Sequence, residues 1–232
     1  MQTTSVSIYG DSLLRATVPD QNFRYHFTFQ PFLDRITTAL PVSLLNRAHF
    51  GATVKKGESL LERDISQGQV SDYMLLEYGG NDCNFDWSSV AQHPEANHFP
   101  MTELAKFTQA MRTMAKKILA CGSTPVFMTL PPIDAHRYLS FICRDGLDRN
   151  SILHWLGDEQ MIYRYQELYS DSIAKLASQE KLVCLDVRSA FLQRHDLSQL
   201  IAADGIHLSP QGYDFLFGLL FDALQGASTQ AG

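Results

Sequence analysis

The stretch Ser5-Val6-Ser7-Ile8-Tyr9-Gly10-Asp11-Ser12-Leu13 opens the chain with a short β-type run that ends in a glycine and a serine. Similar runs recur at wide intervals, and each is followed by a longer segment whose apolar residues have helical spacing. This alternation is typical of a parallel sheet with helical crossovers. We therefore expect an α/β fold, a doubly wound three-layer α/β/α sandwich with about five parallel strands.

The expected elements form one domain over residues 1–225, followed by a flexible tail over 226–232. The strands are expected at Ser5 to Tyr9, Val42 to Arg47, Tyr73 to Tyr78, Pro125 to Leu130 and Leu182 to Val187. Helical spacing covers Phe32 to Leu40, Leu60 to Ile65, Thr102 to Ala120, Asp158 to Gln179 and Pro210 to Leu224. Two long connections, 83–101 and 131–157, follow strands at their carboxyl ends, where open α/β sheets bind ligands. They are candidates for a lid or a specificity region, and a helical insertion that only covers the sheet is the alternative.

The amino-acid composition and the net charge exclude some classes of protein. Of 232 residues, 45% are hydrophobic and 19% are charged, which is typical of a globular chain. Lys and Arg total 19 against 25 Asp and Glu, a net charge of −6, whereas a nucleic-acid-binding domain is normally basic. The most apolar C-terminal stretch, Phe215 to Leu224, is too short to cross a bilayer. We therefore expect no nucleic-acid partner and no membrane insertion, and the composition leaves the oligomeric state open.

The cysteines and the N-terminal residues indicate the cellular compartment in which we expect the protein. The four cysteines are scattered and form no zinc-type pair: Cys83, Cys121, Cys143 and Cys184. Residues Met1 to Gly10 lack the basic and apolar regions of a signal peptide. We expect reduced thiols and a cytoplasmic protein, with secretion left open if the N-terminus is processed.

A serine lies at the end of the first expected strand. Gly10 allows a sharp turn there, and Ser12 would stand at the start of a following helix, where partial positive charge favours an anion. This is a favourable place for a nucleophile. Asp11 and Ser12 taken alone also fit an ordinary helix cap.

A carboxylate precedes a histidine by three residues near the other end of the chain. In Asp204-Gly205-Ile206-His207 the carboxylate can reach back to Nδ1, fix the tautomer of the ring and leave Nε2 free as a general base. Ser12, Asp204 and His207 follow the chain order of other α/β hydrolase triads. The chain has eight histidines, so a satisfied or surface histidine is the alternative for any one of them.

Acyl transfer also needs hydrogen-bond donors for the tetrahedral oxyanion. The segment Gly79-Gly80-Asn81-Asp82 directly follows the third expected strand, so the Asn81 amide would project from the same sheet edge as Ser12. Gly51 follows the second expected strand and can offer a backbone N–H to the same anion. Each segment on its own is also ordinary loop chemistry.

Together these segments resemble the GDSL or SGNH hydrolase superfamily. The matching blocks span nearly the whole chain and are Gly10-Asp11-Ser12-Leu13, Gly51, Gly79-Gly80-Asn81-Asp82 and Asp204-Gly205-Ile206-His207. The resemblance implies a flavodoxin-like sandwich, with Ser12 as nucleophile and His207 as a base oriented by Asp204. It also implies an oxyanion hole made by the N–H groups of Ser12 and Gly51 and the side chain of Asn81. It implies no metal and no organic cofactor.

The expected function is a serine-dependent ester hydrolase that acts through an acyl-enzyme on a small or carbohydrate-linked O-acyl ester. The alternatives are a lysophospholipase- or thioesterase-type hydrolase, an acyltransferase on the same triad, and a non-catalytic flavodoxin-like ligand-binding domain. Candidate substrate-contacting residues are Asp11, Phe85, Trp87, Pro132, Ile133, Tyr138 and Ile206. His93 and His98 suggest a metal pair, but no further ligand completes the set, so we expect no metal site.

Overall fold

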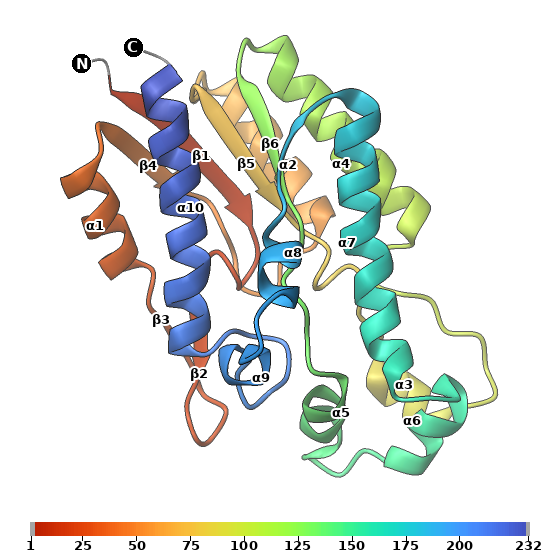
Figure 1. Cartoon of the computed structure of the whole chain (residues 1–232). Helices are drawn as coiled ribbons and strands as arrows, with labels where there is room; N and C mark the ends of the chain where they lie inside the picture. The colour runs from red at the N-terminus through yellow and green to blue at the C-terminus, as the bar shows by residue number, and fades with distance from the viewer. Residues whose placement is uncertain (1–2, 231–232) are drawn as a thin grey trace.

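A sheet of five parallel strands forms the centre of the molecule (Figure 1). The computed structural model describes residues 3–230. The strand order is β4-β1-β5-β6-β7, with β1 at Thr4–Gly10, β4 at Val42–Asn46, β5 at Tyr73–Glu77, β6 at Thr124–Met128 and β7 at Val183–Leu185. All five expected strands are present. The strand β7 ends earlier than expected because the Asp186 side chain accepts a hydrogen bond from the Ser189 N–H and begins a helix.

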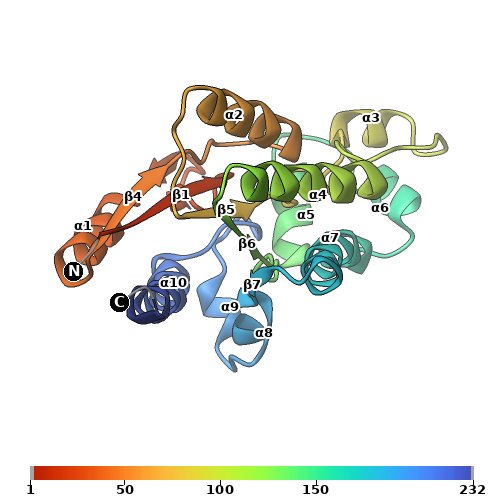
Figure 2. The same ribbon diagram turned by 90° about the horizontal axis from the view of Figure 1, so that it is seen from above.

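Helices cover both faces of this sheet, as the sequence predicts. One face carries α2 (Val54–Ser66), α4 (Leu104–Ala120) and α7 (Gln160–Glu180), and the other carries α1 (Gln30–Ala39), α8 (Val187–Leu192), α9 (Leu197–Leu200) and α10 (Pro210–Gln230). Figure 2 shows α2 and α4 on one side of the sheet and α8, α9 and α10 on the other. Side chains alternate between the faces along each strand, so Ile8 packs in one core and Tyr9 in the opposite one. The three-layer sandwich is confirmed.

The two long connections contain helices and pack together beyond the carboxyl ends of the strands. Segment 83–101 contains α3 (Trp87–Gln92), and segment 131–157 contains α5 (Ala135–Cys143) and α6 (Arg149–Leu156). Together with the first turn of α7 they form a third apolar cluster, separate from the two cores of the sandwich. Figure 1 shows α3, α5 and α6 gathered at the end of the molecule to which the strand arrows point.

The segment after Ser12 differs from the sequence expectation. Residues 12–16 form a turn and not the start of a helix, with Ala16 in the left-handed region at φ 53° and the Thr17 N–H bonded to the Ser12 carbonyl. The chain then forms a hairpin of β2 (Thr17–Pro19) and β3 (Tyr25–Phe27). The expected contribution of a helix N-terminus at Ser12 is therefore wrong.

The final helix begins as predicted and ends later. The Ser209 hydroxyl accepts a hydrogen bond from the Gly212 N–H, and Pro210 occupies the first helical position. The helix α10 continues to Gln230, so most of the segment expected as a tail over 226–232 is helical, and residues 231–232 lie outside the described part of the chain. Within residues 3–230, none of the helices is both long and apolar enough to span a bilayer.

Candidate active site

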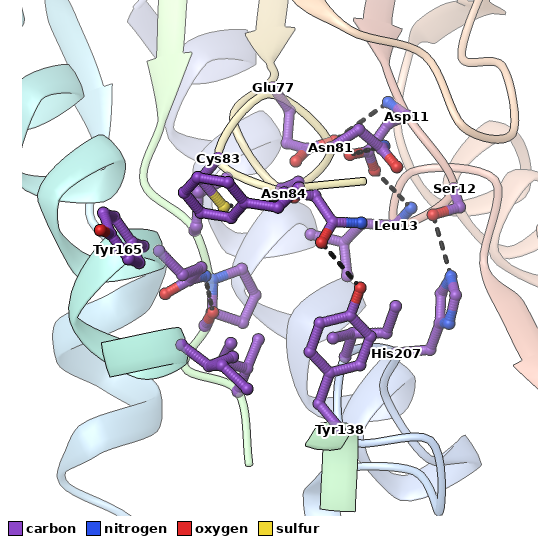
Figure 3. Close-up of a pocket in the computed structure, with 18 of the residues that line it drawn as sticks. Asp11, Ser12, Leu13, Glu77, Asn81, Cys83, Asn84, Tyr138, Tyr165 and His207 are labelled. Carbon is purple, nitrogen blue, oxygen red and sulfur yellow. Dashed lines mark hydrogen bonds between the residues drawn. The ribbon is translucent and has the colours of Figure 1, made fainter. Parts of the chain in front are cut away.

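Ser12, His207 and Asp204 form a continuous hydrogen-bonded chain (Figure 3). The Oγ of Ser12 lies 2.9 Å from Nε2 of His207, and Nδ1 of the same ring lies 2.7 Å from Oδ2 of Asp204. Ser12 lies two residues after the end of β1, while the other two residues lie in the connection between α9 and α10. The fold thus brings together groups that are 195 positions apart in the sequence, in the order that the sequence predicts.

The Asp204 carboxylate is fixed by its own turn. Its Oδ1 accepts the N–H groups of Ile206 at 3.2 Å and His207 at 3.0 Å, which leaves Oδ2 for the imidazole. Burial tends to raise the pKa of Asp204, but the hydrogen bonds and charge of His207 outweigh it, and the pKa is lowered. Asp204 therefore stays ionised, so it holds the ring with a proton on Nδ1 and leaves Nε2 facing Ser12.

The donors predicted for an oxyanion differ in availability. The N–H of Ser12 has no acceptor within the described residues. The Asn81 amide is placed beside Ser12, but its Nδ2 donates to Oδ2 of Asp11 at 2.8 Å and to the Ala52 carbonyl at 3.1 Å, which uses both of its hydrogens. Gly51 is exposed, at φ 69°, and lies outside the residues that line the cavity at Ser12.

Asp11 organises the backbone around the serine. Its Oδ1 accepts the Leu13 N–H at 2.8 Å and its Oδ2 accepts the Asn81 amide, while its own N–H donates to Oε2 of Glu77 at 3.2 Å. Asp11 is 4% exposed and Glu77 is 1% exposed. A buried pair of acidic side chains therefore lies next to Ser12 and the Asn81 amide.

The carboxyl groups beside Ser12 have raised pKa values. Burial raises the pKa of Glu77 well above its usual range, and the nearby Asp11 carboxylate raises it further. Burial also raises the pKa of Asp11. Nearby, burial raises the pKa of Asp82 to about 6, although its carboxylate accepts the N–H of Val54 at the start of α2. Two like charges in a dry environment are costly, so Glu77 is the member of the pair that keeps its proton.

A cavity of about 760 Å³, including its mouth, opens beside Ser12 and His207. Six of the seven predicted substrate-contacting residues line it, namely Asp11, Phe85, Trp87, Ile133, Tyr138 and Ile206. Pro132 does not line the cavity, and its neighbour Pro131 does. The residues that sequence reasoning missed are Leu13, Glu77, Gly80, Cys83, Asn84, Leu130, Pro131, Ile162, Tyr165 and Gln166. Most of the lining belongs to the two long connections and α7, so these segments form the wall of the site.

Two aromatic rings, one half-buried and one exposed, pack against His207 and form a rim. The ring of Tyr25 lies 5.0 Å from the imidazole, and the ring of Phe50 stacks on it at 6.2 Å between centroids. Tyr25 belongs to β3 of the hairpin, which the sequence did not predict, and Phe50 is 46% exposed. No motif marks these rings as part of a site, because they reach His207 only through the fold of the hairpin.

The other polar groups that the sequence singled out do not form a metal centre. His98 Nε2 bonds to the backbone carbonyl of His93 at 2.9 Å, and its ring packs against Trp155. Within residues 3–230, no group of three or more His, Cys, Asp or Glu side chains is placed to hold a metal ion.

Comparison with known proteins identifies the family of this chain. The model of the GDSL-like lipase/acylhydrolase family matches residues 8–215. The human isoamyl acetate-hydrolyzing esterase 1 homolog is 22% identical over 227 residues, which cover 94% of this chain and 80% of the human protein. The GDSL esterase/lipase CPRD49 of Arabidopsis thaliana is 25% identical over 66% of this chain and 54% of its own length.

Solved structures share the fold. The lipase/acylhydrolase from Enterococcus faecalis superposes with a TM-score of 0.67 at 19% identity, covering 98% of this chain and 97% of that one. A catalytic mutant of the acetylxylan esterase Axe2 from Geobacillus stearothermophilus gives a TM-score of 0.66 at 17% identity, covering 96% and 94%. Because the family model spans almost all of the sandwich, the chain belongs to the GDSL-like lipase/acylhydrolase family and is a carboxylic ester hydrolase.

Proposed function

We propose that this protein is a serine esterase that works through an acyl-enzyme, with Ser12 as nucleophile, His207 as base and Asp204 as its orienting carboxylate. The observation that carries this proposal is the 2.9 Å contact between Ser12 Oγ and His207 Nε2, with Nδ1 already held by the carboxylate. In this geometry Nε2 is an acceptor for the serine proton, which is what activation of a hydroxyl requires.

The reaction has two balanced halves. Ser12 Oγ attacks the ester carbonyl while its proton passes to His207 Nε2, and the carbonyl electron pair moves to the oxygen. When this intermediate collapses, the bond to the alcohol oxygen breaks, and the alcohol leaves with the proton from Nε2. Water then adds to the acyl-serine with His207 again taking the proton, and the acid and free Ser12 are restored.

The developing oxyanion needs donors close to Ser12. The N–H of Ser12 has no acceptor within residues 3–230, which supports its assignment as one donor. The Asn81 amide is the second, and its bond to the Ala52 carbonyl at 3.1 Å is the longer of its two and the one we expect it to exchange for substrate. Gly51 precedes Ala52 and its N–H also has no acceptor within the described chain, so it joins the hole if its exposed loop moves inward on binding.

The substrate we propose is a small or carbohydrate-linked O-acyl ester. Packed aromatic side chains form part of the cavity wall: Phe85 and Tyr165 line the cavity, and the Phe85 ring lies 4.9 Å from the rings of both Tyr165 and Trp155. Such a wall favours a short acyl group over a long chain. The acetylxylan esterase that shares the fold supports a carbohydrate ester, and the half-buried Tyr25 and exposed Phe50 rings offer a surface on which a sugar can stack.

The decisive experiment compares Ser12→Ala with Ser88→Ala, an exposed serine of α3 that makes no described side-chain hydrogen bond. Both are assayed on p-nitrophenyl esters from acetate to palmitate and on acetylated sugars, and both are treated with a fluorophosphonate probe. We expect only Ser12→Ala to lose hydrolysis and labelling, and activity to be highest on short esters. Labelling or turnover that survives Ser12→Ala refutes the mechanism, while an unlabelled wild-type protein indicates a ligand-binding domain.

The same assay separates the other acyl-group reactions. Preference for palmitate or for a thioester favours the lysophospholipase- or thioesterase-type activity. Acylated glycerol or sugar among the products, when these alcohols are added, shows acyl transfer in place of hydrolysis.

For location we propose the cytoplasm, which the four unpaired cysteines of the described chain support.

A further inference from the structure

The side-chain amide of Asn84 has a defined orientation in the cavity. One atom of this amide lies 2.8 Å from Nε1 of Trp87 and 2.9 Å from the hydroxyl of Tyr138. The indole N–H is only a donor, so the atom that it contacts must be the amide oxygen. The two aromatic side chains are 9% and 7% exposed, and they therefore fix the oxygen from the buried side.

The amide nitrogen of Asn84 is consequently presented to the cavity. It donates to no acceptor within the described residues, and Asn84 is one of the residues that line the cavity. Figure 3 shows the oxygen bonded to Tyr138 and the nitrogen turned toward the side where Ser12 and Leu13 lie. The backbone is also held, since the Asn84 carbonyl accepts the Met101 N–H at 2.8 Å.

Gln166 also lines the cavity, but its side-chain amide differs from that of Asn84 in its hydrogen bonding. The Nε2 of Gln166 donates to the Pro131 carbonyl at 2.8 Å, and its Oε1 accepts from Nη1 of Arg188 at 2.8 Å. Gln166 is therefore satisfied at both ends and serves the wall of the cavity. Among the described residues, Asn84 has hydrogen-bond partners only at its side-chain oxygen, so its amide N–H groups are available to a ligand.

The position of Asn84 assigns it to the acyl half of the substrate. His207 Nε2 must deliver its proton to the departing alcohol, so the alcohol lies on the His207 side, where Tyr25 and Phe50 form the open rim. Tyr165 lies across the cavity from Ser12 and His207, and Asn84 lies between them (Figure 3). The acyl group therefore extends past the Asn84 amide toward the wall that Phe85 and Tyr165 form.

We propose that Asn84 is a specificity residue that donates a hydrogen bond to an oxygen atom in the acyl group, as in hydroxy-, alkoxy- or oxo-substituted acyl esters. The proposal rests on the proposed acyl-enzyme function. A plain hydrocarbon chain would displace water from the Asn84 N–H groups and leave them unpaired, which is unfavourable. A site built around such a donor discriminates against the analogue that lacks the acceptor.

Two esters isolate this interaction. The acyl groups of p-nitrophenyl methoxyacetate and p-nitrophenyl butyrate have equal length and differ by one oxygen in place of a methylene. Their intrinsic reactivities differ, but this difference cancels when the ratio of their kcat/KM values is compared between wild type and variants. We expect Asn84→Leu to lower the methoxyacetate-to-butyrate ratio by about tenfold.

Further variants keep the test independent of folding defects. Asn84→Asp keeps an oxygen for Trp87 and Tyr138 and places an acceptor where the donor was, so the ratio is also expected to fall. The control Asn97→Leu changes an exposed residue of segment 83–101 and should leave the ratio unchanged. A ratio unchanged in both Asn84 variants, with butyrate still hydrolysed, overturns this inference alone. Activity that survives Ser12→Ala overturns the proposed mechanism instead.

Discussion

Replacing Glu77 by glutamine should change how the stability of the protein depends on pH. Glu77 is buried beside Asp11, whose N–H donates to its Oε2, and burial followed by the charge of Asp11 raises its pKa well above the ordinary value of 4.5. The native state therefore keeps a proton that the unfolded chain releases. Glutamine has a similar shape and does not titrate, so the Glu77→Gln variant lacks this linkage.

The magnitude follows from proton linkage. A carboxyl whose pKa is raised on folding stabilises the native state fully below its unfolded pKa, and this stabilisation is lost as pH rises. The loss is about 1.4 kcal/mol for each pH unit above 4.5 over which Glu77 stays protonated in the native state. Relative to wild type, Glu77→Gln should therefore gain about that much stability per pH unit. The raised pKa of Asp82 acts in both proteins and largely cancels in the comparison.

Urea denaturation at pH 5, 6, 7 and 8 measures this difference. The matched control is Glu58→Gln, a residue of α2 that makes no described ion pair. We expect the free energy of unfolding of the control to run parallel to that of the wild type, and the curve of Glu77→Gln to diverge upward with pH. Parallel curves for Glu77→Gln and wild type would refute the assignment of a retained proton to Glu77.

Other substitutions test the packing that supports the site. Tyr78→Phe should raise the free energy of unfolding by about 1–3 kcal/mol, because its buried hydroxyl has no hydrogen-bond partner among residues 3–230. Tyr9→Phe should lower the free energy of unfolding, since the Tyr9 hydroxyl donates to Asp64 Oδ2 at 3.1 Å. Thermal melts in which Tyr78→Phe and Tyr9→Phe shift the melting temperature in the same direction would contradict this expectation. Gly205→Ala should lower both the melting temperature and kcat, because the residue has φ 80° and an added Cβ would lie 2.4 Å from the Tyr138 nitrogen. Full activity of a folded Gly205→Ala protein would show that the turn tolerates a side chain.

The sequence predicted the sheet well because its strands are short apolar runs followed by helical spacing. The run that ends at Tyr9 and the run that ends at Tyr78 both became central strands. The hairpin β2–β3 was missed because three-residue strands, one of them containing Pro19, carry too little periodicity to be recognised. The helix expected after Ser12 was wrong because Asp11 and Ser12 fit a helix cap as well as a turn.

The candidate site also contains residues that the sequence predicted and residues that it missed. The contact between Ser12, His207 and Asp204 was predictable because these residue types follow the chain order of other α/β hydrolase triads. Glu77 was not, since it ends a strand and only burial beside Asp11 gives it an unusual pKa. Asn84 follows the predicted Asn81 by three positions, but its significance depends on two aromatic donors that the fold places around it.

The helix α5 has a consequence for redesign and for divergence within the family. The Asp134 N–H at its start donates to the Gly205 carbonyl at 2.8 Å, and the Arg137 guanidinium donates to the carbonyls of Ser198 and Ile201. The same helix supplies Tyr138 to the cavity. Changes in α5 that widen the cavity therefore also disturb the loop that carries His207. Replacing Tyr165 on α7 by a smaller residue should broaden the substrate range with a smaller loss of kcat than a change in α5.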